Sequence, residues 1–263
     1  MRLIEKPDEF SSKFSRWNGS ENLKGYPFVQ NQHAPFTPLK RALPLLNLGL
    51  ISSAGAFITG TDGFDTDARD GDLTYREIPI EVGAQDLSFA AKGYDPAAVL
   101  EDLNSQIPID RLLEFQANAV IGELNPVWWS ISSYVPNALR VSEELAPAIA
   151  ERLKRYEVRA ALFIPASRLC HQTLAIIARG VESTGIPTMM ISVDRSVSDQ
   201  IRPPRSAYYD GEFGSVAGKP DWREYQCRIL DESIRWIESF DQPSAKKLAV
   251  DIETQVETAR GER

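Results

Sequence analysis

The sequence predicts an α/β fold in which a mostly parallel open sheet is flanked by helices. The main observation is the stretch from Val158 to Asp194, where an apolar run, a segment with helical spacing and a second apolar run follow one another. Strand, helix, strand is the unit that joins two parallel strands through a crossover. Gly185 ends the helical spacing and Pro187 opens the second run, so the boundaries of these elements are marked as well.

The composition fits one globular domain with short additions at its ends. The chain has 263 residues, of which 43% are hydrophobic and 25% are charged, and this is enough apolar material for a full core. We therefore predict a single Rossmann-like α/β domain over residues 41–263, with its last helices at about residues 221–258. Residues 1–40 are predicted to form an N-terminal arm that packs on this body.

Charge and cysteine content exclude several classes of protein. A net charge of -8 argues against binding to nucleic acid or to a membrane surface, because both require clustered Lys and Arg. Cys170 and Cys227 are too few for a disulfide framework, which indicates a reducing, cytoplasmic location. The N-terminus carries charges throughout, unlike a secretory signal. The uncharged run from Ala42 to Thr61 is long enough to span a bilayer, but Pro44 and several glycines and serines favour a buried strand with a loop.

The first third of the chain holds an aromatic arm and a predicted central strand. Residues Phe10 to Pro38 have many aromatic side chains and no clear period, and His33 lies there in a polar loop. His33 is interpreted as an ordinary surface or hydrogen-bonded residue, with a catalytic role as the alternative. Leu45 to Ile51 is predicted to be a central strand, and the small residues after it, Ser53 among them, allow either a tight turn or a close approach to a ligand.

An acidic loop and a strand follow. The segment from Thr61 to Asp72 holds five aspartates, but it has one residue too many before its glycine to fit an EF-hand calcium loop. A solvated acidic loop is therefore predicted. Gly71 to Val82 alternates as a strand, which places Arg76 and Glu77 on opposite faces. Arg76 is suited to bind a substrate carboxylate, and a structural salt bridge is the equal alternative.

The remaining elements are predicted from caps and helical spacing. Asp95 fits the N-cap of a helix that begins at Pro96, and another helix starts at Pro108. Further along we expect a strand at Val127–Tyr134, a long amphipathic helix at Asn137–Tyr156, a long loop over residues 196–220, a helix at Trp222–Phe240 and a charged helix from Pro243 to about Thr258.

Cys170 is the main candidate for chemistry. It falls where the first strand of the Val158–Asp194 unit gives way to the helix, and ligands of open parallel sheets bind at this carboxyl end of the strands. A helix N-terminus lowers the pKa of a cysteine, which favours the reactive thiolate. His171 is its neighbour, but adjacent helical residues point about 100 degrees apart, so His171 need not be its base. The alternative is a buried cysteine beside a histidine that bonds to the backbone.

Other kinds of site lack their sequence signals. Zinc is disfavoured because the chain has two cysteines and two histidines, with no close spacing other than the adjacent Cys170 and His171, so carboxylates would have to complete the ligand set. The chain has no G-x-S-x-G elbow of a serine hydrolase, and no glycine-rich nucleotide-binding motif. We therefore predict no bound metal and no bound cofactor.

Four segments in order resemble the selenoprotein B family of glycine, sarcosine, betaine and D-proline reductases. They are GDLTYREIP (Gly71–Pro79), KGYD (Lys92–Asp95), PIDRL (Pro108–Leu112) and CHQTLAIIARGVESTGIPT (Cys170–Thr188). The resemblance spans roughly Leu48 to Val193. It implies a cytosolic α/β protein that uses a selenol or thiol to cleave a carbon–nitrogen bond of an amino-acid derivative reductively, often beside a partner subunit.

Two departures from that family define what the chain is able to do. Redox-active members pair two chalcogens across two intervening residues, and here Ser167 occupies the first position, so no internal disulfide or selenenylsulfide forms at this site. Phe89 to Lys92 also lacks the histidine that many relatives carry there. A lone Cys170 would need an external thiol or a partner protein as its reductant.

Our hypothesis from the sequence is a thiol-dependent enzyme resembling amino-acid reductases. Its substrate is expected to be a small amino-acid-like molecule, with no nucleic acid or membrane as partner, and with a partner subunit or a homo-oligomer as its assembly. The alternative is a non-catalytic binding or partner subunit that has lost the redox pair. The expected site residues are Cys170, His171 and Asp95 for catalysis and Arg76, Glu77, Tyr94, Ser167 and Ser53 for substrate binding.

Overall fold

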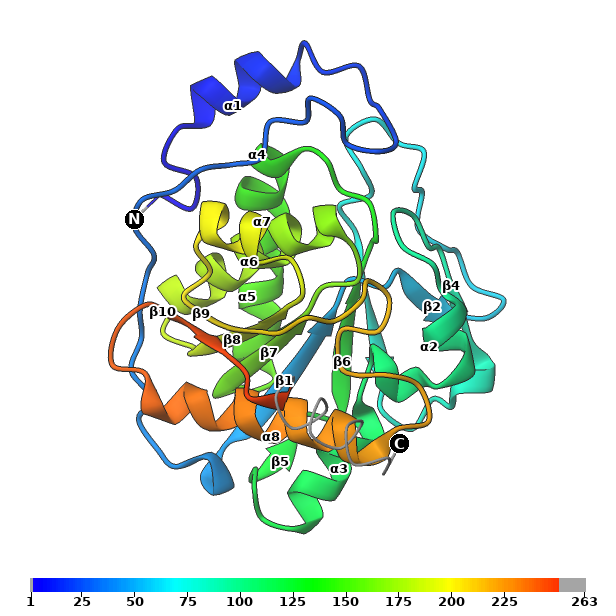
Figure 1. The fold of residues 1–263 in the computed structure, drawn as a ribbon, viewed down its shortest axis with the longest axis vertical. Coiled ribbons are helices and arrows are strands. Elements are labelled where there is room, and N and C mark those ends of the chain that lie inside the picture. Colours follow the sequence, from blue (N-terminus) through cyan, green and yellow to red (C-terminus); the bar gives the residue numbers. More distant parts are fainter. Residues whose placement is uncertain (1, 251–263) are drawn as a thin grey trace.

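The computed structural model describes residues 2–250 and has an α/β architecture (Figure 1). Within these residues, eight strands form a mixed sheet with the order β10-β9-β8-β7-β1-β6-β3, and β5 pairs beside β6 on β1. All neighbouring strands of this sheet are parallel except β3, which is antiparallel to β6. A separate antiparallel pair joins β2 to β4. The strands are β1 (Asn47–Ser52), β2 (Ala56–Ile58), β3 (Tyr75–Pro79), β4 (Leu87–Phe89), β5 (Glu123–Leu124), β6 (Val127–Ile131), β7 (Ala160–Ile164), β8 (Thr188–Ser192), β9 (Arg205–Tyr208) and β10 (Ser244–Lys247).

The predicted strand, helix, strand unit is confirmed as β7, α6 (Arg168–Ser183) and β8. Every residue of β7 is buried, because helices cover both faces of the sheet at this point. Leu162 of β7 faces one hydrophobic core and Phe163 faces the other, as the alternation of side chains along a strand requires. Strands buried on both faces carry continuous apolar runs, and this is why the run was visible in the sequence.

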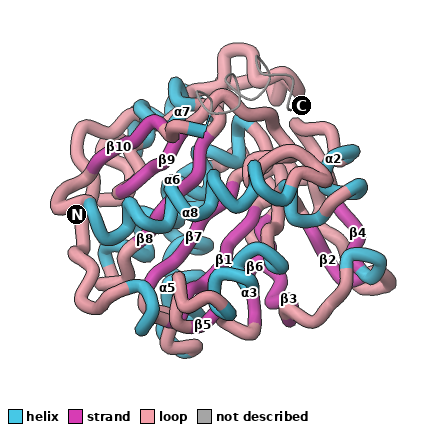
Figure 2. Tube along the Cα trace, turned by 60° about the horizontal axis from the view of Figure 1, so that its bottom comes forward, coloured by secondary structure: helices cyan, strands magenta, loops and turns pink. Residues whose placement is uncertain are grey.

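Two helical layers enclose the sheet. One contains α4 (Ala138–Arg140), α5 (Ala146–Arg155), α6 and α7 (Arg195–Ile201), with α5 and α7 both packed on α6. The other contains α2 (Ala97–Glu101), α3 (Ile109–Ala117) and α8 (Arg223–Ser239), and α8 runs across β8 and β9 (Figure 2). No helix among residues 2–250 combines the length and the apolar character needed to cross a membrane.

The N-terminal arm lies over the layer that contains α6. Its helix α1 (Pro7–Phe14) sits above α4, at the top of Figure 1. Three buried polar side chains of α6 hold the arm by its backbone. Gln172 accepts from Val29 N at 2.8 Å, Arg179 donates to the carbonyls of Leu3 and His33 at 2.9 and 2.7 Å, and Glu182 accepts from Thr37 N at 2.6 Å.

The predicted long loop over residues 196–220 is wrong in its first half, because most of α7 and all of β9 lie within it. Asp194 caps α7 by accepting from Val197 N at 3.1 Å, and β9 pairs with β8. Both elements are short, and β9 owes its form to pairing with a strand that is close only after folding. A sequence period is not detectable over so few residues.

Two further predictions need correction. The segment that begins the predicted helix at Pro243 contains the edge strand β10, and its part beyond residue 250 lies outside the described residues. The predicted helix at Asn137–Tyr156 is divided into α4, a π-helical turn at Val141–Leu145 and α5. Pro147 lies in the first turn of α5, where a missing N–H is tolerated. Because Pro147 has no N–H, the carbonyl four residues before it cannot accept the usual α-helical hydrogen bond, and the preceding turn is π-helical. The helix predicted at Trp222–Phe240 is confirmed as α8.

Candidate functional site

The Cys170 side chain lies where β1, β6 and β7 end. Its thiol donates to two backbone carbonyl oxygens, those of Ser53 after β1 and Ser133 after β6, each at 3.3 Å. Ser167, after β7, caps α6 by accepting from Cys170 N at 3.2 Å. The predicted position of Cys170 at the carboxyl edge of the sheet is therefore confirmed, and three strand ends converge on its sulfur.

The expected low pKa of Cys170 is not found in this closed state of the protein. The side chain is 1% exposed, and burial raises the pKa of the thiol above its ordinary value. The hydroxyls of Ser167 and Ser53 and the backbone amides of Ala166 and Ser167 act in the opposite direction, because each stabilises a thiolate by hydrogen bonding. Burial outweighs these donors, so the thiol stays protonated at neutral pH while the site is closed.

His171 is bound by the backbone and does not face the thiol. Its Nδ1 donates to Ser167 O at 2.7 Å, and its Nε2 accepts from the amides of Val193 and Asp194 at 3.1 and 3.3 Å. Burial lowers the pKa of His171 to about 4, so the ring is neutral above that pH. Both ring nitrogens are occupied, and His171 thus joins the turn after β7 to the turn after β8. This matches the structural alternative for His171 and leaves no nitrogen for proton transfer in the closed state.

A cap covers the thiol, and we define it as the turn 92–95 together with segment 209–218. Tyr94 donates from its hydroxyl to Ala54 O at 2.6 Å, and Gly214 N donates to Ala166 O at 2.9 Å. The two parts touch each other closely: a Cβ on Gly214 would lie 2.5 Å from Asp95 O. Gln106 links the cap to the end of β7, because its side chain accepts from Val216 N at 3.1 Å and donates to Ile164 O at 3.2 Å.

The structure brings Ser53, Ser167 and Tyr94 to the thiol, but it holds three other predicted residues by different contacts. Arg76 packs over the Phe64 ring and donates to Gly63 O at 3.1 Å. Asp95 is exposed and accepts from Ala97 N at 3.0 Å, at the start of α2.

Glu77 forms an ion pair with Arg152 of α5. The closest N–O distance is 2.6 Å, and Glu77 also accepts from Trp129 Nε1 at 3.1 Å. The hydrogen bond from Arg152 is the largest cause of a lowered pKa for Glu77. The salt bridge that was considered for Arg76 is therefore formed by Glu77. Arg76 has other partners, as expected because the two residues lie on opposite faces of the strand.

Ser133 was missed from the sequence, and it shares a visible signal with the predicted residues Ser53 and Ser167. Serines lie at or within three residues of the ends of four parallel strands: Ser52 in β1 and Ser53 after it, Ser132 and Ser133 after β6, Ser167 after β7 and Ser192 in β8. Three of the buried polar atoms without a hydrogen-bond partner in the described chain are Ser105 Oγ, Ser130 Oγ and Trp128 Nε1, and Ser130 lies near the carboxyl end of β6. Ser130 is the register partner of Ser52, whose hydroxyl contacts Gln106. Buried donors without partners are rare in folded proteins and point to a place for a ligand.

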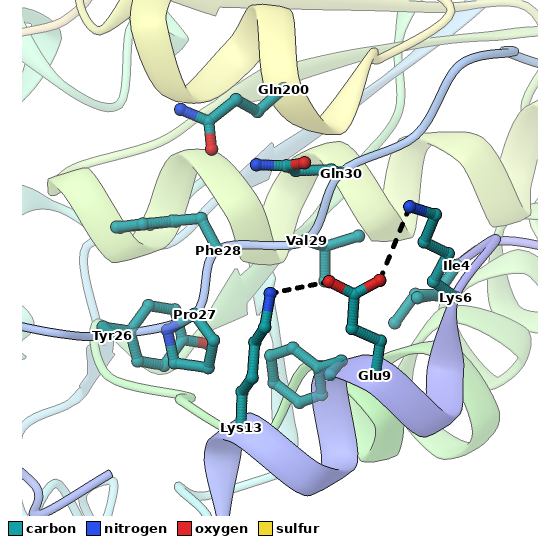
Figure 3. Close-up of a pocket in the computed structure, with 11 residues that line it drawn as sticks. Ile4, Lys6, Glu9, Lys13, Tyr26, Pro27, Phe28, Val29, Gln30 and Gln200 are labelled. Carbon is teal, nitrogen blue, oxygen red and sulfur yellow. Dashed lines mark hydrogen bonds and ion pairs between the residues drawn. The ribbon is translucent and has the colours of Figure 1, made fainter.

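A pocket in the arm is separate from this edge. Figure 3 shows its lining, which includes Tyr26 and Phe28 and a rim where Lys6 and Lys13 both contact Glu9. None of the site residues predicted from the sequence lines it. The single Glu9 carboxylate contacts both lysines of this rim.

The sequence profile of one known family matches part of the chain. The family is described as glycine/sarcosine/betaine reductase selenoprotein B, and the match covers residues 79–166. These residues run from the end of β3 to the turn after β7. They include the serines after β6 and end shortly before Cys170.

Two curated proteins are similar over more of the chain. D-proline reductase subunit gamma from Acetoanaerobium sticklandii is 29% identical over 213 residues, which cover 81% of this chain and 86% of that protein. Glycine reductase complex component B subunit gamma from Symbiobacterium thermophilum is 27% identical over 176 residues, which cover 63% of this chain and 39% of that protein. The match therefore spans well under half of the second relative. No solved structure matches the chain.

Proposed function

We propose that the chain, which matches the glycine/sarcosine/betaine reductase selenoprotein B family over residues 79–166, is a subunit of an amino-acid reductase assembly in which Cys170 is the nucleophile. The proposed substrate is a small amino-acid derivative whose carbon–nitrogen or related bond is cleaved. The observation that carries the proposal is the convergence of Ser53, Ser133 and Ser167 on the Cys170 sulfur.

The surroundings of Cys170 suit a thiolate once the burial is relieved. The Ser53 and Ser167 hydroxyls and two backbone amides are already placed to stabilise negative charge on the sulfur. The unpaired Ser130 hydroxyl, opposite Ser52 in the sheet register, supplies a donor for a polar group of a substrate. We propose that the cap opens to admit substrate, which hydrates the sulfur and lowers its pKa.

The proposed reaction balances without an internal second thiol. The Cys170 sulfur forms a bond to the carbon that carries the amino group, and the nitrogen leaves with the bonding electron pair and takes a proton. An external thiol or a thiol-bearing partner protein then attacks the Cys170 sulfur. The carbon fragment leaves with a proton, and a disulfide joins the two sulfurs. A second external thiol reduces that disulfide, so two thiols supply two electrons per turnover.

The experiment compares the two cysteines of the chain. The protein, isolated with the subunits that accompany it, is incubated with dithiothreitol and with glycine, sarcosine, betaine or D-proline. Carbon–nitrogen cleavage is measured as release of ammonia or amine from the first three and as formation of the ring-opened primary amine from D-proline. We expect Cys170→Ser to lose activity by about 10³-fold or more, as the removal of a nucleophile does. Cys227→Ser is the matched control and should keep the wild-type rate, because Cys227 lies on α8, away from the strand ends. Full activity of Cys170→Ser would reject the proposal.

The second candidate is a non-catalytic partner subunit, and the burial of Cys170 favours it. A thiol that is 1% exposed and bonded to two carbonyls is a common structural arrangement. This candidate predicts that Cys170→Ser leaves amine release by the assembly unchanged and that the variant still co-purifies with its partners. The same measurements therefore decide between the two functions.

A further inference from the structure

A second pocket lies between the arm and the acidic loop, on the far side of Ser133 from the thiol. It has a volume of ≈ 380 Å³ and is lined by Phe14 and Trp17 of the arm, Asp67 and Arg69 of the acidic loop, and Lys92 and Tyr134. This volume falls within the range of about 300–1,000 Å³ that is typical of small-molecule sites. Neither Cys170 nor the serines of the strand ends line it.

The carboxylates of the acidic loop organise its backbone. Asp65 Oδ1 accepts from Asp67 N and Ala68 N at 2.9 and 3.0 Å, and Asp72 Oδ2 accepts from Asp65 N at 3.0 Å. Among the described residues, no group of three or more acidic, histidine or cysteine side chains is arranged to hold a metal ion. The loop is thus folded by its own aspartates, and it presents Asp67 and Arg69 to the pocket.

The pocket has an excess of positive charge. Lys92 Nζ donates to Thr66 O at 2.7 Å and to Asp67 Oδ1 at 3.2 Å, which leaves one of its three N–H donors unused. The Asp67 side chain is 94% exposed, so this ion pair is weak. Within the described part of the chain, the exposed Arg69 guanidinium has no hydrogen-bond or ion-pair partner. Two cations against one carboxylate suit a ligand with a single negative charge.

Aromatic rings form the rest of the lining. Phe14 and Trp17 stack on each other with ring centroids 6.0 Å apart, and the Trp17 indole is held by a hydrogen bond to Lys24 O at 3.1 Å. Tyr134 lies under Lys92, whose Nζ is 4.3 Å from the ring centroid. Rigid rings beside a guanidinium recognise a molecule that has an apolar body and an anionic end.

We propose that this pocket binds a small organic carboxylate with an apolar or aromatic body. Arg69 and Lys92 hold the carboxylate, and Trp17 and Phe14 cover the body. A phosphate ester is disfavoured because its second negative charge would face Asp67. The pocket is separate from the thiol site but adjacent to it: Lys92 N donates to Ser133 Oγ at 2.9 Å, and Ser133 O accepts from the Cys170 thiol.

The test uses phenylacetate as a probe and titration calorimetry of the full chain. Phenylacetate is compared with phenylacetamide, which has the same body without the charge, and with acetate, which has the charge without the body. We expect phenylacetate to bind with a Kd on the order of 1 mM, as its size allows, and both comparison compounds to bind at least about tenfold more weakly. Equal binding of phenylacetate and phenylacetamide would refute the proposal, and so would no binding at about 10 mM.

Variants assign the binding to this pocket. Arg69→Gln should weaken phenylacetate about tenfold without affecting phenylacetamide, whereas Arg16→Gln, on an exposed arginine outside the lining, should change neither. Trp17→Ala should reduce phenylacetate to the level of acetate. Cys170→Ser should bind as the wild type does, so the outcome is independent of the thiol proposal. Loss of phenylacetate binding in Cys170→Ser would place the ligand at the thiol instead and overturn the inference.

Discussion

At the scale of single residues, His171 is the clearest case of a side chain fixed by its surroundings. Its Nδ1 donates to Ser167 O and its Nε2 accepts two amides, so only the neutral ring satisfies all three contacts. A protonated ring would place an N–H against two N–H donors inside the protein. The two turns that carry the carboxyl edge of the sheet therefore depend on a neutral histidine.

His171 should make stability fall as the pH is lowered. The pKa is 6.5 for the free side chain and about 4 in the folded protein, so between these values the unfolded chain binds a proton that the folded chain does not. The contribution of neutral His171 to the free energy of unfolding is complete above about pH 6.5. Between about pH 6.5 and pH 4, the free energy of unfolding falls by up to about 1.4 kcal/mol for each pH unit. Urea unfolding at pH 8, 7, 6 and 5 measures the slope.

Two histidine variants isolate this slope from the carboxylates that titrate in the same range. His171→Gln is expected to be less stable at pH 7 but to lose less stability between pH 6.5 and pH 5 than the wild type. His33→Gln changes the other histidine of the chain, which is exposed, and should keep the wild-type slope. If His171→Gln and the wild type had the same slope, the protonation argument would be wrong.

The sequence predicted where Cys170 lies but not what its sulfur contacts. Its position followed from the apolar run before it and the helical spacing after it, which are local properties. The contacts with Ser53 O and Ser133 O join segments more than thirty residues apart, and no local pattern contains them. Arg76 and Glu77 show the same limit, because their alternation was visible but the partner Arg152 was not.

At the scale of elements, the cap is closed over a thiol whose side chain is 1% exposed. The turn 92–95 and segment 209–218 meet at Gly214, which has a φ of +81° and lies against Tyr94 and Asp95. Only glycine adopts this conformation without strain, and there is also no space for a Cβ. The contact is tight in the closed state, so a small change at Gly214 should shift the balance toward an open cap.

Gly214→Ala is expected to expose Cys170. The added Cβ would lie 2.5 Å from Asp95 O and 2.7 Å from the Tyr94 ring, so segment 209–218 must move away. We predict that iodoacetamide alkylates Cys170 at least about tenfold faster, which corresponds to about 1.4 kcal/mol in favour of the open state. The rate is measured by mass spectrometry in a Cys227→Ser background, where Cys170 is the only thiol.

Gly60→Ala is the matched control for backbone strain. Gly60 also has a positive φ, +86°, but a Cβ there would meet no atom within 4 Å. It should therefore cost a similar strain energy and leave the alkylation rate unchanged. Equal rates in the Gly214 and Gly60 variants would mean that the contact at Gly214 does not hold the cap closed.

Elements were predictable where their signal was long or continuous. The 16-residue helix α6 and the 17-residue helix α8 were both identified, because each presents several turns of amphipathic spacing. The short elements α7 and β9 were missed, and β10 was expected to be helical. The charged residues Lys246 and Lys247 suited an exposed helix as well as an edge strand, and only the pairing with β9 decides between them.

At the scale of the whole molecule, the buried polar side chains of α6 connect the arm to the sheet. Arg179 is fully buried, and its guanidinium reaches the carbonyls of Leu3, His33, Ile201 and Arg202. Burial lowers the pKa of Arg179 to about 10, so it remains charged at neutral pH. Glu182 forms a buried ion pair with Arg205 of β9 at 2.7 Å and also holds Thr37 of the arm. The arm thus depends on charges that the helical spacing alone did not reveal.

Arg179→Met is expected to loosen the arm while the sheet stays folded. Methionine fills much of the space but leaves the carbonyls of Leu3 and His33 without a donor, and each unpaired buried group costs about 1–3 kcal/mol. Hydrogen exchange of peptides that cover residues 26–40 should therefore become at least about tenfold faster, while peptides from β7 keep their protection. Arg195→Met is the control, since Arg195 is 61% exposed and its contacts are with Asp199 of its own helix and the Tyr208 ring, so it should leave the arm unchanged. Unchanged exchange in the arm of Arg179→Met would show that the aromatic contacts around Tyr26, and not the buried guanidinium, hold the arm in place.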